Sequence, residues 1–224
     1  MLWNYVNLIL GILLLIFPGC VKYKGPGYTP NINLTKTSPS IPLKIDSRPL
    51  VDSSPPAGKE SGYMTGSGSS ATSKETLKGD LATLITTLLR GEFQRSNLFE
   101  AIDSDLPTPD LVLSGTIHPF YERTTEPLIG LCCGLLTGFI GLPFFIEEGA
   151  VDLEPTLSSP DGKIVKTYRK QADYDKWMNA YDGRAWHPYR HGLYLNKTMA
   201  EVTTLLRDMI LADRTLLTNS KPSP

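Results

Sequence analysis

Few residues of this 224-residue chain have the types and spacing that catalysis or metal binding requires. His187 and His191 lie four apart, a spacing that suits zinc on a helix, but Pro188 opposes that helix and no HExxH order is present. Glu147 and Glu148 could pair as acid and base, or could simply close the apolar run before them. No GxSxG turn is present either. We therefore expect a protein that is not an enzyme and that holds no metal or cofactor.

The three cysteines divide into an adjacent pair and a single residue. Cys132 and Cys133 are not expected to bridge each other, because the ring that joins neighbouring cysteines is strained. Two thiols are also too few for tetrahedral zinc. Within the uncharged sequence LIGLCCGLLTGFIG, we interpret them as small apolar side chains.

Cys20 follows a short apolar run. Residues 8–17 are uncharged, have the length of the apolar part of a signal peptide and are too few for an ordinary transmembrane helix. With the small residue Gly19 directly before the cysteine, the pattern resembles a bacterial lipoprotein signal. The resemblance implies cleavage before Cys20 and acylation there, and each buried acyl CH2 contributes ~0.8 kcal/mol to membrane binding. No Lys or Arg precedes the run, so an uncleaved N-terminal anchor remains the alternative.

The rest of the chain is long enough for one ordinary domain. The 22 basic and 23 acidic residues give a formal charge of −1, so no overall field favours nucleic acid. Residues after Cys20 are rich in Gly, Pro, Ser and Thr, a composition typical of linkers. We expect a signal peptide over 1–19, a flexible linker over 20–40, a periplasmic domain over 41–217 and a disordered tail over 218–224.

Hydrophobic periodicity predicts the first elements of this domain. Alternating apolar residues indicate a strand over 41–50. A helix is expected after Thr72, which would form a capping box with Glu75, and it should fray near Gly91 or continue to Gln94. A second strand over 110–123 begins with a nearly continuous apolar run, so it is predicted to be central in its sheet.

The second half of the domain adds a hairpin and a helix. The turn sequence SSPDGK joins predicted strands over 150–157 and 164–168. Asn196 is expected to cap the last helix. Its predicted apolar face consists of Met199, Val202, Leu205, Leu206, Met209 and Ile210. This order predicts an α+β fold, a two-layer sandwich of a mostly antiparallel sheet with two main helices.

Leu128 to Ile146 contains nineteen residues without a charge and four glycines. We favour a segment that packs on the sheet of its own domain, because Pro143 and the spaced glycines suit a folded hairpin. A segment that dips into one leaflet and a membrane span are the two other interpretations. Its candidate contacts with a membrane or a partner are Leu131, Leu135, Phe139, Ile140 and Phe144.

Aromatic residues are dense between Tyr168 and Tyr194. Interleaved with basic residues, they could stack on bases or sugars. We favour a loop that packs half-buried rings against an edge of the sheet. Trp177 and Trp186 are its candidate contacts with a membrane or a partner.

The helix TLKGDLATLITTLLRGEF, the strand DLVLSGTIHPFYER, the hairpin VDLEPTLSSPDGKIVKTY and the C-terminal helix together resemble ABC-transport auxiliary lipoproteins. They are also similar to the α/β domain of the curli-secretion lipoprotein. The resemblance covers roughly residues 74–215 and implies envelope assembly, transport support or scaffolding rather than catalysis.

We therefore expect a non-catalytic accessory module of an envelope complex, bound to the membrane through Cys20, with unidentified protein partners and no nucleic acid. The alternative is a membrane-inserting or pore-forming subunit that uses residues 128–146. Val21 after the cysteine, rather than Asp, favours the outer membrane over an inner-membrane anchor by analogy with enteric sorting.

Overall fold

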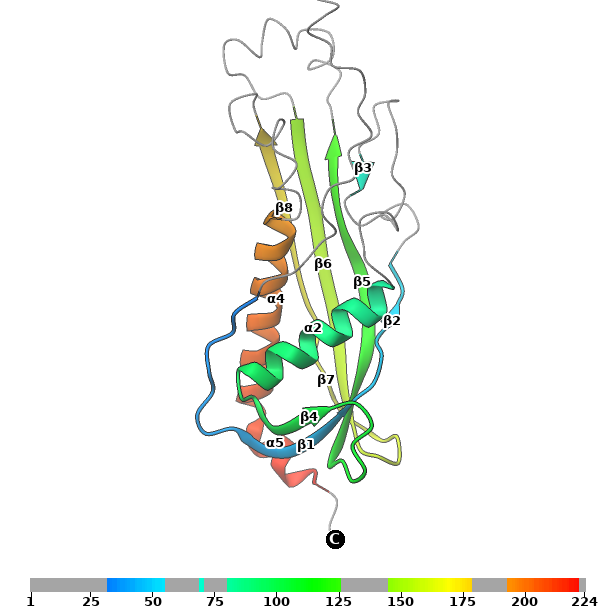
Figure 1. The fold of residues 1–224 in the computed structure, drawn as a ribbon, viewed down its shortest axis with the longest axis vertical. Coiled ribbons are helices and arrows are strands. Elements are labelled where there is room, and N and C mark those ends of the chain that lie inside the picture. The colour runs from blue at the N-terminus through cyan, green and yellow to red at the C-terminus, as the bar shows by residue number, and fades with distance from the viewer. Residues whose placement is uncertain (1–31, 55–68, 71–79, 126–144, 179–192, 222–224) are drawn as a thin grey trace, which may run out of the picture.

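The computed structural model describes residues 32–54, 69–70, 80–125, 145–178 and 193–221. They form one sheet with helices packed on one of its faces (Figure 1). The strands are β1 (Ile41–Ser47), β2 (Val51–Asp52), β3 (Ser69–Ser70), β4 (Phe99–Asp103), β5 (Leu111–Thr125), β6 (Phe145–Ser158), β7 (Ile164–Thr167) and β8 (Lys170–Met178). The helices are α2 (Leu81–Arg95), α4 (Leu193–Ala212) and α5 (Arg214–Asn219). The predicted α+β class is confirmed.

The sheet combines a short parallel part with a long antiparallel part. β1 lies between β4 and β5 and is parallel to both. β5, β6 and then β7 and β8 are antiparallel neighbours, and β7 and β8 pair with different parts of β6. The predicted central strand is confirmed as β5, and the predicted hairpin as β6 and β7.

One face of the sheet carries the core. In β1, Ile41, Leu43 and Ile45 are fully buried between more exposed neighbours, as the alternation predicts. The helices add Leu81, Ile85, Leu89 and Phe93 from α2 and Met199, Val202, Leu206 and Ile210 from α4. Burying each such side chain contributes about 1.5–3 kcal/mol. A single core therefore joins both main helices to the sheet.

Helix α2 begins later than predicted. Asp80 has an extended backbone and is the N-cap, and its carboxylate accepts a 3.1 Å hydrogen bond from the Thr83 amide. That bond satisfies an amide that a helix start leaves unpaired. Thr72 and Glu75, the predicted capping box, lie outside the described residues. Of the two predicted ends, Gly91 and Gln94, the second agrees within one residue with the observed end at Arg95.

Two predictions about the last helix are wrong. Asn196 lies inside α4, which already includes Leu193, so its side chain is not the cap. Short polar residues favour caps but also occur within a first turn, so composition alone does not separate the two. Met209 is 38% exposed although it was placed on the apolar face, because α4 turns it away from the core that buries Leu206.

Part of the predicted aromatic loop is a strand. Lys170–Met178 forms β8, which pairs with β6 through nine successive residues from Lys170–Leu153 to Met178–Phe145. Of the side chains that alternate toward the helices, Ala172 and Tyr174 are only partly buried. The pairing with β6 therefore defines this strand, while its own apolar pattern is too weak to predict it.

Residues 32–40, predicted as linker, pack on the domain, and we call them the strap. Ile32 is 2% exposed and belongs to the core. Its carbonyl accepts from Arg95 Nη1 at 3.1 Å, and the Leu34 amide donates to Glu92 Oε2 at 3.3 Å. Residues 32–40 therefore belong to the folded part of the chain, which was predicted to start at residue 41. The low apolar content of the strap concealed this, because one deeply buried side chain and main-chain hydrogen bonds hold it.

Candidate functional site

The structure describes one of the contact residues that the sequence proposed, Trp177. The others lie outside the described residues: Cys20, Leu131, Leu135, Phe139, Ile140, Phe144 and Trp186. Cys132, Cys133, His187 and His191 lie outside them as well.

Trp177 lies in the last row that β5, β6 and β8 share, one residue before the final pair of β6 and β8. It is 59% exposed and pairs with Ile146 of β6, which in turn pairs with Thr125, the last residue of β5. We call Thr125, Ile146 and Trp177 the strand-end row, and Figure 1 shows the three strand ends together at the top. Because the register aligns these ends, the chain segments 126–144 and 179–192 join the described part at the same end of the molecule. Sequence separation had concealed this common attachment.

Below this end, Tyr174 crosses β6 on the face that carries the helices. Glu122, Gly149 and Tyr174 are directly aligned on β5, β6 and β8. The Tyr174 hydroxyl donates to Glu122 Oε2 at 2.7 Å, and Glu122 is 1% exposed. A Cβ on Gly149 would lie 2.7 Å from the Tyr174 ring and 2.6 Å from the Tyr121 carbonyl oxygen. Gly149 is therefore required for the ring to reach across the strand.

Helix α4 closes over this arrangement. The ring of Tyr194, in its first turn, lies 5.5 Å from the ring of Tyr174. A buried carboxylate costs free energy unless a donor hydrogen-bonds to it, and the Tyr174 hydroxyl is such a donor to Glu122. The sequence signal that could have found the contact is the glutamate in an apolar strand aligned with a glycine in its partner. That alignment follows from the register, which one sequence does not supply.

Glu147 and Glu148 project to opposite faces of β6, because side chains alternate along a strand. Glu147 is 4% exposed and aligns with Lys176, whereas Glu148 aligns with Asp175. Two carboxylates on opposite faces do not meet one substrate. The structure thus excludes the hypothesis of an acid and base pair at these positions.

An ionic network lies on the face away from the helices. Arg169 donates two hydrogen bonds to the Asp152 carboxylate, at 3.1 and 2.7 Å, and lies 3.7 Å from Glu154. His118 Nε2 lies 3.1 Å from Glu154 Oε2. The Asp152 carboxylate raises the pKa of the Arg169 guanidinium. Because Arg169 hydrogen-bonds to an Asp152 side chain that is only 2% exposed, the network links β5, β6 and the connection between β7 and β8.

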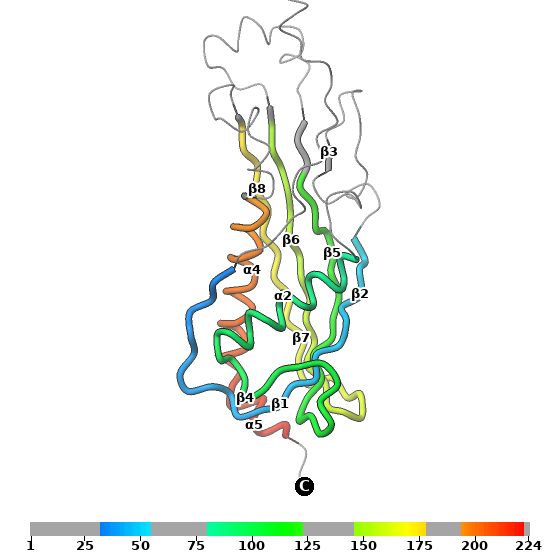
Figure 2. Tube along the Cα trace, in the orientation of Figure 1, coloured from blue at the N-terminus to red at the C-terminus, as the bar shows by residue number. Residues whose placement is uncertain are grey.

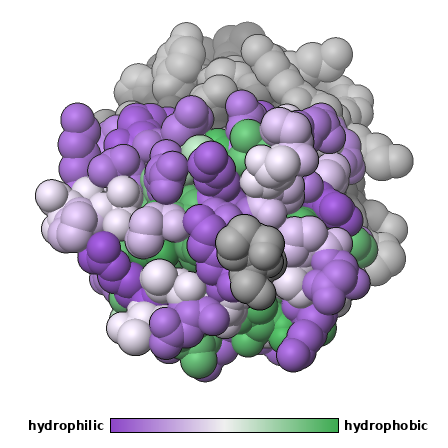
Figure 3. Space-filling view, turned by 90° about the horizontal axis from the view of Figure 1, so that it is seen from below, coloured by the Kyte–Doolittle hydropathy of each residue, from purple (hydrophilic) through white to green (hydrophobic). Residues whose placement is uncertain are grey.

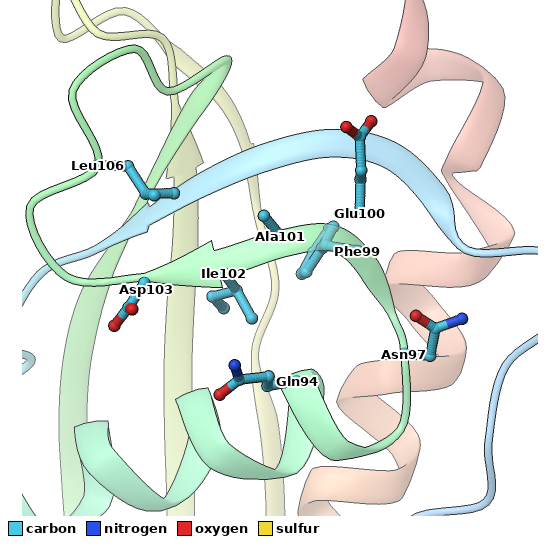
Figure 4. Close-up of a pocket in the computed structure, with 8 residues that line it drawn as sticks. All are labelled: Gln94, Asn97, Phe99, Glu100, Ala101, Ile102, Asp103 and Leu106. Atoms are coloured by element: carbon cyan, nitrogen blue, oxygen red, sulfur yellow. The ribbon is translucent and has the colours of Figure 1, made fainter.

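A pocket of about 360 Å3 lies at the other end of the molecule, between the end of α2 and the outer edge of β4 (Figure 4). Its lining residues are Gln94, Asn97, Phe99, Glu100, Ala101, Ile102, Asp103 and Leu106. β4 pairs with β1 on one side, and no described strand pairs with its other side. An edge of this kind offers main-chain donors and acceptors to an added strand.

Within the described ranges, no three His, Cys, Asp or Glu side chains are placed to hold a metal ion. No helix in that part of the chain has the length and apolar character needed to cross a membrane.

No family model matches the sequence, and no curated protein matches it. Among solved structures, it is similar to a Xanthomonas campestris protein of the family DUF330, with 14% identity, a TM-score of 0.49, and coverage of 86% of this chain and 95% of that one. A PelC dodecamer from Paraburkholderia phytofirmans has 10% identity, a TM-score of 0.33, and coverage of 80% and 95%. A candidate lipoprotein from Caulobacter crescentus has 12% identity, a TM-score of 0.32, and coverage of 62% and 85%. At these identities and TM-scores, the likenesses assign neither a family nor a function.

Proposed function

We propose that this chain is a lipid-anchored protein of the bacterial cell envelope that acts as a non-catalytic module of an assembly or transport complex. The anchor is Cys20, and the protein faces the periplasm from the outer membrane. The observation that carries the interaction role is the outer edge of β4, with which no strand of the described residues pairs, and the pocket beside it. A partner segment in extended conformation would add to that edge through main-chain hydrogen bonds and place side chains in the pocket.

The chemistry of this edge indicates the charge of the partner segment. Glu100 is exposed, and the side chain of Asp103 is 64% exposed with Arg90 at 3.5 Å. The sequence from residue 99 to residue 110 contains four acidic residues and no basic one. A partner segment with lysine or arginine therefore complements the edge better than an acidic one.

The anchor is tested by metabolic labelling with a fatty-acid analogue. Cys20→Ala should abolish the label and leave an uncleaved precursor, whereas Cys132→Ala and Cys133→Ala should leave labelling and processing unchanged. Label that persists in Cys20→Ala contradicts the anchor. Sucrose-gradient fractionation then distinguishes the outer from the inner membrane.

The interaction role is tested by photo-crosslinking in intact cells. A photoreactive amino acid at Glu100 should form one reproducible adduct with an envelope protein. The same amino acid at Glu201, a glutamate on α4 that is also exposed, should form none. Equal adducts at both positions, or none at Glu100, contradict a contact at the β4 edge.

A further inference from the structure

The strap determines where the N-terminal part of the chain leaves the domain. Arg214 of α5 donates to the carbonyl of Ser40 at 3.1 Å, and Arg207 of α4 donates to that of Thr35 at 3.1 Å. Traced backwards from Ser40, the strap therefore runs from α5 along α4 to the buried Ile32. Figure 2 shows this blue segment rising beside α4, toward the end where β8 finishes.

The docked strap also shortens the chain between the anchor and the domain. Twelve residues separate Ile32 from Cys20, and they span at most ~40 Å when fully extended. Measured from Ile41, the separation would be 21 residues and about 70 Å. The shorter connection limits how far the domain can lie from the membrane, and either end of the domain could face it. The direction in which the strap points and the surface chemistry of each end indicate which end faces the membrane.

The two ends present different surfaces. At the strand-end row, the exposed indole of Trp177 lies beside Ile146. An indole combines an apolar body with a hydrogen-bond donor, which suits the headgroup level of a bilayer. The opposite end, seen in Figure 3, is mostly hydrophilic, with hydrophobic residues in separate places.

Charges next to the row limit how deeply it can enter lipid. Glu148 and Asp175 form the next aligned pair on the face that carries Ile146 and Trp177, about 7 Å along the strands. Carboxylates are costly within hydrocarbon. Contact is therefore confined to the row itself, at the level of the headgroups.

We propose that the strand-end row is a membrane-contact surface that rests on the headgroups of the bilayer holding the Cys20 acyl chains. This proposal rests on the proposed function, because it requires the lipid anchor. It orients the β4 edge and its pocket away from the membrane, toward a partner in the periplasm.

The tryptophans of the chain allow a direct test. The mature protein carries Trp177 and Trp186, since Trp3 belongs to the signal peptide. Trp186→Phe, or Trp186→Tyr if the first variant does not fold, leaves Trp177 as the single tryptophan. The control adds Ile164→Trp and Trp177→Phe, which moves the indole to the far end of the sheet. Ile164 is 65% exposed and pairs with Ser158, the last residue of β6.

Both lipidated proteins are reconstituted in vesicles of phosphatidylethanolamine and phosphatidylglycerol that contain a lipid brominated near the headgroup. Emission from Trp177 should fall about twofold relative to unbrominated vesicles, while emission from residue 164 should not change. An unquenched Trp177 in a vesicle-bound, acylated protein overturns the membrane contact and leaves the anchor intact. Equal quenching at both positions overturns the orientation. A chain without lipid on Cys20 by mass spectrometry overturns the anchor, and the proposed contact with it.

Discussion

The two ends of β6 differ in what surrounds them. At the Ser158 end, the parallel strands β1 and β4 and the helix α5 close the core, and arginines hold the strap. At the Phe145 end, three strands finish in one row beside an exposed tryptophan. The difference teaches that the ends of one long strand can be packed very differently, one within the core and the other beside an exposed aromatic side chain. A substitution in the core at the packed end should therefore lower the free energy of unfolding much more than a substitution of the exposed tryptophan.

The largest effect is expected where the core is closed. Phe93→Ala removes a fully buried ring that packs edge-on against Phe99, with centroids 6.3 Å apart, so it should lower the free energy of unfolding by about 3–5 kcal/mol. Trp177→Ala should change it by less than about 0.5 kcal/mol, because the side chain is mostly exposed. Urea unfolding of both variants measures the two changes in unfolding free energy, and similar losses in both would contradict the difference between the two ends.

The strap should be the next most sensitive part. Ile32→Ala should cost about 2–4 kcal/mol, since it removes a side chain that is 2% exposed from the core. It should also speed tryptic cleavage after Lys36, which is exposed in the strap. Lys36→Ala serves as the control for stability and should leave the unfolding midpoint unchanged. An Ile32→Ala protein of unchanged stability would show that the strap is not part of the core.

Gly149→Ala tests the contact in which the Tyr174 ring crosses β6 to reach Glu122, between the two ends of that strand. The new Cβ would meet the Tyr121 carbonyl and the Tyr174 ring, so we expect a loss of about 1–3 kcal/mol and a displaced Tyr174. Gly91→Ala is the matched control. That helical position has its nearest neighbour at 4.0 Å, and alanine should stabilise it by about 0.5–1 kcal/mol. Thermal unfolding of both variants distinguishes them, and equal shifts would mean that the ring does not depend on Gly149.

The smallest effect concerns alkaline pH at the closed end. Burial raises the pKa of the Tyr168 phenol, and the Asp213 carboxylate raises it further. The unfolded phenol ionises near its ordinary pKa of about 10 while the folded one keeps its proton, so stability is full below pH 10 and falls above it. The slope from this group approaches about 1.4 kcal/mol per pH unit. Urea titrations between pH 9 and 11 should show this slope in the wild type and lose it in Tyr168→Phe, and an unchanged slope would contradict the assignment.

The alternation in β1, the apolar residues of α2 and the turn between β6 and β7 were all predictable from the sequence. Local periodicity and turn chemistry determine such elements with little help from distant residues. The acylation pattern at Cys20 is likewise a property of consecutive residues and stays a prediction. Helix starts were less predictable, because Thr72, Asp80 and Asn196 all have side chains that can cap.

Tertiary structure alone decided which distant residues meet. β8 exists as a strand because β6 supplies its hydrogen-bond partners, and the register then places Tyr174 over Gly149 and against Glu122. The strap is ordered by one buried isoleucine and by side chains more than fifty residues away. Such contacts depend on strand register and long-range packing, which a single sequence does not encode in any local pattern. The same register brings Trp177 to the strand-end row, whereas the sequence by itself identified it only as a candidate contact residue within an aromatic loop.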